Sequence, residues 1–145
     1  MKKLFYSVVV AAALATDLNS CSKTCEAGYE GSDCKTAVNT KFAGTYAVKD
    51  TSTTGGVASV FTYTMTVSAP SSEPSKINIS NFGGFGTGTT ATASVDGTNF
   101  TLTNTTLAGV QIQNGSGSVN GNSLSFSYTS IDSSSSATSH AVGTK

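Results

Sequence analysis

The chain has 145 residues, of which 37% are apolar and 11% are charged. This length suits one compact domain, and this composition is too polar for an integral membrane protein. Eight Lys balance eight Asp and Glu, and no Arg is present, so no basic stripe exists to neutralise phosphates and we expect no nucleic-acid partner. One His and three Cys cannot supply a multi-histidine metal site or the usual catalytic sets, so we expect no metal, no cofactor and no enzyme.

Residues 1–20 have the pattern of an export signal. Two lysines precede an apolar run from Leu4 to Leu14, and a short polar segment follows before Cys21. The apolar run is too short to cross a hydrocarbon core of about 30 Å, which disfavours an uncleaved anchor. A cut after Ala15 is the alternative, and it would release a secreted protein that begins at Thr16.

The segment Leu18-Asn19-Ser20-Cys21 resembles the lipobox of bacterial lipoproteins. In that family the signal peptidase cuts before the Cys, which then carries a diacylglyceryl group and a third acyl chain, palmitate among them. Two or more acyl chains give stable anchoring. The resemblance therefore implies lipidation of Cys21 and a membrane partner. Because Ser22 follows the Cys where Asp would suggest inner-membrane retention, it also implies an address at the outer membrane.

The remaining cysteines fit this assignment. Three Cys in an exported chain leave an odd thiol, which lipidation of Cys21 accounts for. Cys25 and Cys34 then form one disulfide pair, which an oxidising location would preserve.

The run from Cys25 to Cys34 also resembles the last disulfide loop of an EGF-like module, with Gly28-Tyr29 after the first Cys and Gly31 before the second. In that family the glycines allow positive φ in a tight hairpin. The other EGF cysteines and the acidic calcium motif are absent. The resemblance implies a disulfide-pinned spacer over residues 21–40, between the lipid and the following domain.

Residues 41–145 alternate polar and apolar side chains and are rich in Thr, Ser, Val, Tyr and Phe, which predicts strands and no helix. The apolar faces of the first three expected strands are Phe42, Gly44, Tyr46 and Val48; Phe61, Tyr63, Met65 and Val67; and Ile77 and Ile79. Turn signals at Asp96-Gly97 and Asn120-Gly121 then predict two hairpins. The expected strands of this half cover residues 91–95, 100–102, 110–119, 123–129 and 137–144.

About eight antiparallel strands joined by turns predict either a β-sandwich or an up-and-down β-barrel. We favour the barrel for residues 41–145, because successive hairpins indicate a meander and closure removes the unpaired edges of a weakly charged sheet. The opening Gly44-Thr45-Tyr46 resembles the first strand of the calycins, the lipocalin-like barrels, which have an aromatic residue, usually Trp, at the barrel floor. The C-terminal helix usual in that family is missing.

An eight-stranded barrel is either filled by its own side chains or holds one small ligand, and both outcomes stay open. Aromatic side chains expected to point inward are the candidate pocket lining: Tyr46, Tyr63, Phe100, Phe126 and Tyr128. Tyrosine hydroxyls in an apolar cup would suit a small amphipathic molecule. The glycine-rich segment 81–88 lacks phosphate-loop spacing and is expected to be a flexible loop or bulge, with Phe82 or Phe85 exposed at its tip. His140 is expected at the surface.

These patterns favour a non-enzymatic lipoprotein of the outer membrane that presents a small barrel for binding a hydrophobic or amphipathic ligand. The alternative is a structural or protein-interaction lipoprotein with a filled barrel.

Overall fold

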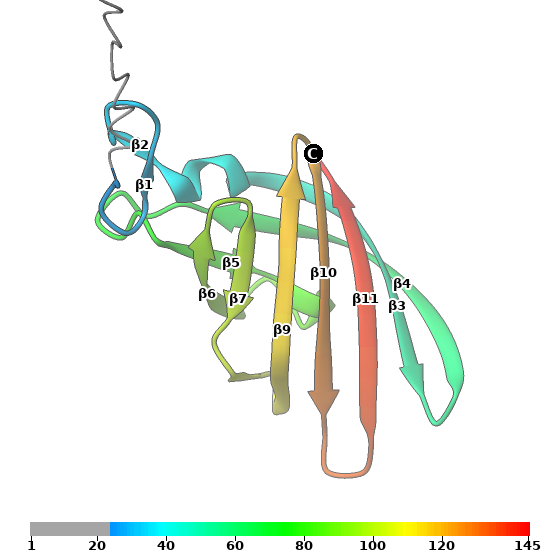
Figure 1. The fold of residues 1–145 in the computed structure, drawn as a ribbon. Coiled ribbons are helices and arrows are strands. Elements are labelled where there is room, and N and C mark those ends of the chain that lie inside the picture. Colours follow the sequence, from blue (N-terminus) through cyan, green and yellow to red (C-terminus); the bar gives the residue numbers. More distant parts are fainter. Residues whose placement is uncertain (1–23) are drawn as a thin grey trace, which may run out of the picture.

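The computed structural model describes residues 24–145, which form a small disulfide-linked hairpin followed by a β-barrel (Figure 1). The expected signal segment 1–20 and the expected lipidation site Cys21 lie outside the described residues. Within residues 24–145, no helix combines the length and the apolar character that a membrane crossing requires.

Eight strands hydrogen-bond in a closed ring. They are β3 (Gly44–Thr54), β4 (Val57–Ser68), β5 (Lys76–Ser80), β6 (Thr90–Asp96), β7 (Asn99–Leu102), β9 (Val110–Asn120), β10 (Ser123–Ile131) and β11 (Ser136–Thr144). All neighbours are antiparallel, and β11 closes the ring on β3, from Ala137 opposite Thr54 to Thr144 opposite Ala47. The predicted up-and-down barrel is confirmed, and the β-sandwich alternative is wrong.

The alternating sequence pattern determines which side chains enter the barrel. In β3, Tyr46, Val48 and Asp50 are buried, whereas Ala47 and Lys49 between them are exposed. The predicted glycine turns also form, with Gly97 and Gly121 at φ of 56° and 57° as the first residues of two-residue loops. One short strand was not predicted: β8 (Thr105–Leu107) pairs with the beginning of β9, outside the ring.

One end of the barrel is closed by a 3₁₀ turn, η1 (Val38–Phe42), where we had expected strand residues from Phe42 onward. The Phe42 ring is fully buried and meets Phe100 edge-on, with 6.2 Å between ring centroids. Tyr46 Oη donates to the Phe42 carbonyl at 2.8 Å. Lys145 Nζ lies 5.2 Å from the Tyr46 ring and donates to the carbonyls of Lys41 and Ala43. Tyr46 therefore sits at the closed end, with a cation covering its ring.

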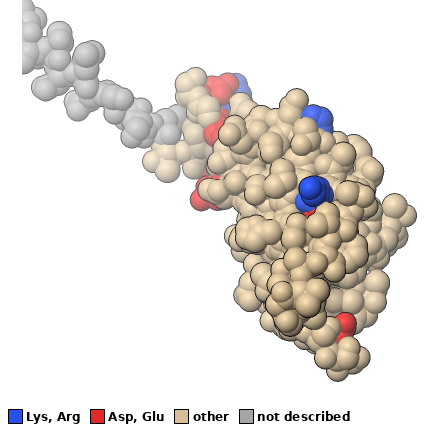
Figure 2. All heavy atoms as spheres, turned by 90° about the vertical axis from the view of Figure 1, so that its right-hand side faces the viewer, with Lys and Arg blue, Asp and Glu red and all other residues tan. Residues whose placement is uncertain are grey.

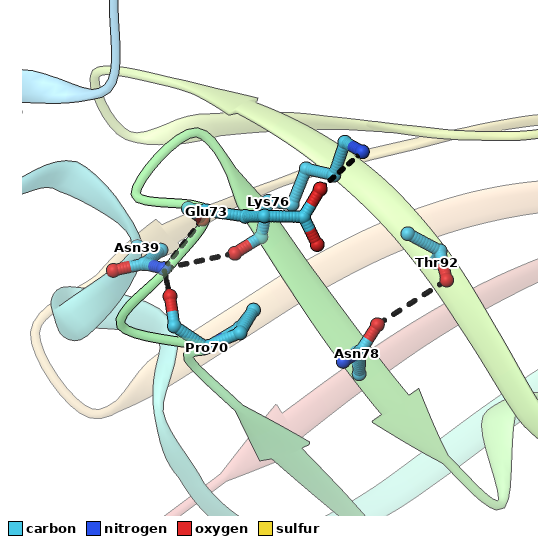
Figure 3. Close-up of polar contacts among 6 residues, drawn as sticks. All are labelled: Asn39, Pro70, Glu73, Lys76, Asn78 and Thr92. Carbon is cyan, nitrogen blue, oxygen red and sulfur yellow. Dashed lines mark hydrogen bonds and ion pairs between the residues drawn. The ribbon is translucent and has the colours of Figure 1, made fainter.

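A buried asparagine ties η1 to the loop between β4 and β5 (Figure 3). Asn39 is 1% exposed, and its side-chain Nδ2 donates to the carbonyls of Pro70, Glu73 and Lys76 at 3.0, 3.1 and 3.0 Å. The two prolines in this loop interrupt strand pairing. The Pro70 and Glu73 carbonyls accept backbone bonds from Glu73 and Lys76 within the loop, and Asn39 adds a donor from η1 that holds the loop across the closed end.

The Cys25–Cys34 disulfide closes a two-stranded hairpin of β1 (Tyr29–Glu30) and β2 (Thr36–Ala37). Gly28 has φ of +89°, and a Cβ at this position would lie 2.7 Å from the Ser75 backbone nitrogen. The Gly28 carbonyl accepts a hydrogen bond from the Val38 amide at 2.9 Å. The hairpin thus packs directly against the closed end of the barrel, and Gly28 allows that close approach.

Candidate ligand site at the open end of the barrel

At the opposite end of the barrel, the strands end at different levels along the barrel axis. The β3–β4 and β10–β11 hairpins are long and extend past the short strands β5 and β6 (Figure 1). The β5–β6 connection folds into this gap as a second 3₁₀ turn, η2 (Phe82–Gly84). Asn81, which precedes η2, donates from Nδ2 to the Thr64 carbonyl at 2.8 Å and accepts from the Gly86 amide at 2.7 Å.

The position of Phe82 corrects the expectation of an exposed loop tip. Its side chain is only 1% exposed, and its ring centroid lies 4.9 Å from that of Tyr128 and 5.3 Å from that of Phe126. Since the short β5 and β6 leave apolar interior uncovered at this level, burial of Phe82 is more favourable than its exposure. Phe85 is half-buried beside it. The glycine-rich segment is therefore a partial cover over the barrel interior.

Beneath this cover lies a buried carboxyl group. Asp50 is 2% exposed, and its Oδ2 accepts hydrogen bonds from Tyr128 Oη at 2.7 Å and from Tyr63 Oη at 3.2 Å. Its other oxygen, Oδ1, is buried and has no hydrogen-bond partner among the described residues. Buried polar atoms without a partner are rare in proteins and reduce the stability of the fold, so this oxygen indicates a candidate functional site.

Burial shifts the pKa of this carboxyl group and of both neighbouring phenols in the same direction, toward their protonated forms. Desolvation raises the pKa of Asp50 above its ordinary value, against the opposing effects of hydrogen bonds from Tyr128 and Tyr63, of the charge of His140 and of the nearby Ser139 hydroxyl. Desolvation likewise raises the pKa of both tyrosines, and the neighbouring Asp50 adds to this effect. Both phenols therefore remain protonated near neutral pH and act as hydrogen-bond donors to the carboxyl group.

A pocket of about 290 Å³ opens over this group. Its lining residues come from β3, β4, η2, β10 and β11: Asp50, Ser52, Phe61, Gly83, Gly84, Phe85, Tyr128, Ser130 and Ser139. Phe61 pairs with Asp50 across the β3–β4 ladder and so points to the same side of the sheet, yet it is 54% exposed. The pocket thus has a polar base, aromatic walls and an open mouth, and its volume is near the lower end of small-ligand pockets.

The five aromatic residues expected to form a pocket separate into two groups. Tyr128 lines the pocket, and Tyr63 lies beside it through its bond to Asp50. Tyr46, Phe100 and Phe126 are buried in the packed core and are not among the lining residues. The barrel is accordingly filled toward its closed end and has a pocket at its open end.

Asp50 and Ser139 were not singled out from the sequence, although their signal was present. Asp50 continues the inward series of Tyr46 and Val48 in steps of two, and Ser139 holds the same relation to Ala141. A carboxylate at an inward strand position is unusual enough to mark a candidate site. Searching for acids close together in the sequence could not find it, because its partners lie on other strands.

A wider hollow of about 620 Å³ lies on the outside of the barrel, over β11, β3 and β4. Its lining includes the outward-facing, exposed residues Ala47, Lys49, Thr62 and Val142. The side of the molecule formed by the β3–β4 hairpin carries few charged groups (Figure 2). Because these four residues are exposed, the hollow is a feature of the outer surface. Residues 24–145 contain no cluster of three or more His, Cys, Asp or Glu side chains that could hold a metal ion.

Comparisons with known proteins support the fold. No family model and no curated protein sequence matches the chain. Among solved structures, it is similar to the crystal structure of a "putative outer membrane protein" from Bacteroides fragilis NCTC 9343, with a TM-score of 0.51 and 16% sequence identity. The similarity covers 76% of this chain and 54% of the other, so the chain spans about half the length of that neighbour. At this identity the likeness shows a shared β fold.

Proposed function

We propose that this protein is a lipoprotein of the outer membrane, anchored through acylated Cys21, whose barrel binds one small amphipathic molecule at its open end. The observation that carries the binding role is the pocket over Asp50, which joins a polar base to aromatic walls. The lipobox-like segment before Cys21 and the name of the Bacteroides neighbour support the envelope location.

Anchoring is tested on the protein from its native cell envelope. The intact mass of the wild type should include acyl chains on Cys21, and the protein should fractionate with the outer membrane. Cys21→Ala should remove both properties. A soluble wild-type chain that begins near Thr16 would instead establish secretion and overturn the anchoring.

Binding is tested on residues 22–145, exported with a signal peptide that is cleaved without lipidation so that the protein is soluble. Thermal unfolding is measured in the presence of a panel of fatty acids, alkyl alcohols and alkylamines. A ligand that binds only the folded state stabilises it by about 2.7 kcal/mol at a hundredfold excess over its Kd. Ser52→Leu should fill the pocket and abolish this stabilisation. Thr53→Leu is the matched control, because Thr53 is exposed on the outer face of the same strand.

The filled closed half of the barrel favours one alternative, a structural or protein-interaction lipoprotein. That alternative predicts no stabilisation by any member of the panel at any concentration. A stabilisation that Ser52→Leu leaves intact would place binding elsewhere and overturn the proposed site.

A further inference from the structure

Among residues 24–145, no cationic side chain forms a salt bridge with the carboxyl group at the base of the pocket. The two salt bridges among the described residues join Lys41 to Glu30 and Lys76 to Glu73, far from this site in the fold. The titratable groups facing Asp50 are the phenols of Tyr63 on β4 and Tyr128 on β10, with His140 on β11 acting only through its charge. Lys49 is adjacent in sequence but points outward and is exposed.

A buried carboxylate usually has either a cation or a full set of hydrogen-bond donors, because removal from water otherwise destabilises its charge. Here both tyrosine hydroxyls donate to Oδ2, and Oδ1 has no hydrogen-bond partner within residues 24–145. The arrangement satisfies half of the acceptor capacity of the group. Oδ1 is shielded from solvent in this structure, so a donor that enters the pocket, which Asp50 lines, reaches it only by displacing the groups that cover it.

The walls of the pocket specify the remainder of such a ligand. Phe61 and Phe85 present aromatic surface, and Gly83 and Gly84 add backbone without side chains, so the body of the ligand meets mostly apolar groups. Aromatic faces also attract cations. An anionic ligand such as a fatty acid would place a second negative charge beside Asp50, which is unfavourable at short range in a poorly solvated site.

We propose that the pocket selects a small organic ammonium compound, whose cationic nitrogen binds Asp50 and whose apolar body packs against Phe61 and Phe85. This inference rests on the proposed ligand-binding function and specifies the class of ligand. Its distinguishing claim is the sign of charge: amines bind, isosteric alcohols bind weakly, and carboxylates are excluded.

The test uses three probes that share one aromatic body: 2-phenylethylammonium, 2-phenylethanol and phenylacetate. Binding is measured by calorimetry near neutral pH and low ionic strength, where electrostatic screening is small. We expect the ammonium to bind at least tenfold more tightly than the alcohol and phenylacetate not to bind. Affinity for the ammonium should fall as the pH is lowered through the pKa of Asp50, because protonation removes the charge it binds, while affinity for the alcohol should stay constant.

Asp50→Asn keeps the shape of the side chain and removes its charge. It should reduce affinity for the ammonium at least tenfold, to that of the alcohol, and change affinity for the alcohol less than threefold. Asp132→Asn, which alters an exposed carboxyl on the β10–β11 loop, should change neither affinity. The pH profile of the wild type gives the same information if Asp50→Asn does not fold.

The outcomes separate this proposal from the one it rests on. Equal affinity for ammonium and alcohol, both lost in Ser52→Leu, would overturn the selection of amines and leave the binding function intact. Tight binding of phenylacetate would do the same. Failure of all three probes would overturn the selection of amines. The binding function would fail with it only if the whole amphipathic panel also gave no stabilisation.

Discussion

The two ends of the barrel differ in whether their buried polar groups have hydrogen-bond partners. At the closed end, Tyr46, Asn39 and Lys145 each direct donors at backbone carbonyls. At the open end, Asp50 keeps one buried oxygen without a partner beneath a pocket. Tyr46 and Asp50 occupy inward positions of the same strand, β3, whereas Asn39 lies in η1 and Lys145 follows β11, so segments outside the ring supply part of the closed end.

This difference indicates a division of roles within one small fold. Satisfied polar groups and close packing at the closed end stabilise the barrel. An unsatisfied group in a pocket costs stability, and sites that bind ligands often carry that cost. Substitutions at the closed end should therefore affect unfolding, and those at the open end should affect binding more than unfolding.

The largest expected loss of stability comes from the floor of the barrel. Tyr46→Ala removes a fully buried ring together with its bond to Phe42 and its contact with Lys145, and it should cost about 3–5 kcal/mol. Tyr46→Phe keeps the ring and should cost about 1 kcal/mol. Urea unfolding measures both. Similar costs for the two variants would show that packing at this end matters little.

Asn39 should rank second. Asn39→Ala leaves the carbonyls of Pro70, Glu73 and Lys76 without their shared donor and should cost about 2–3 kcal/mol in urea unfolding. Asn78→Ala is the control, since the half-buried Asn78 side chain accepts one bond among the described residues, from Thr92 at 3.2 Å (Figure 3). It should cost less than about 1 kcal/mol. Equal costs would mean that Asn39 does not hold the loop.

The strands of the barrel could be predicted from the sequence, whereas the 3₁₀ turns that cover its two ends could not. Alternation and glycine turns predicted the strands and the closed meander, because side-chain period and turn geometry are local properties. The 3₁₀ turns at both ends were missed, since their residues are positioned by the barrel rather than by local propensity. Phe82 was expected to be exposed because its loop is rich in glycine. It is buried because β5 and β6 are short and leave apolar interior for its ring to cover.

The candidate site could be predicted in part. Tyr63 and Tyr128 were expected to point inward, and they do so at the open end. Their separation from Tyr46, Phe100 and Phe126 depends on strand register, which fixes the level of each residue along the barrel axis. Register is not encoded in any single strand. The sequence therefore predicted which aromatic residues point inward, but not which of them belong to the core and which to the pocket.

The contact between the disulfide hairpin and the barrel is tested by a pair of glycines. Gly28 and Gly31 have φ of +89° and +90°, so Ala is strained at both positions. Only at Gly28 would a Cβ also lie within 3 Å of the backbone of Pro74 and Ser75. We expect Gly31→Ala to cost about 1 kcal/mol and Gly28→Ala about 2 kcal/mol. Hydrogen exchange of the Val38 amide, which is bonded to the Gly28 carbonyl, should accelerate only in Gly28→Ala. Equal effects would indicate that the hairpin does not pack on the barrel.

The pH dependence of stability should distinguish the two acids at the open end. The folded pKa of Asp50 is raised, so its favourable contribution is full below the unfolded pKa of about 3.9 and is lost as the pH rises through the folded value. The free energy of unfolding of the wild type relative to Asp50→Asn should therefore fall with rising pH. Hydrogen bonds from Ser134 and Ser135 lower the pKa of Asp132, so the same comparison with Asp132→Asn should show the opposite slope. Matching slopes would contradict the burial of an unpaired carboxyl at Asp50.

Phe61 should show the smallest effect on stability and the clearest separation of binding from folding. Its ring is 54% exposed on the inward face of the sheet, at the mouth of the pocket. Phe61→Ala removes little buried area, so unfolding should change by no more than about 0.5 kcal/mol, while affinity for an aromatic ammonium should fall severalfold as one wall is lost. Val60 is equally exposed, at 56%, but it occupies the next position and points outward. Val60→Ala should leave both stability and affinity unchanged, and a comparable loss of affinity in Val60→Ala would place the ligand on the outer surface rather than within the barrel.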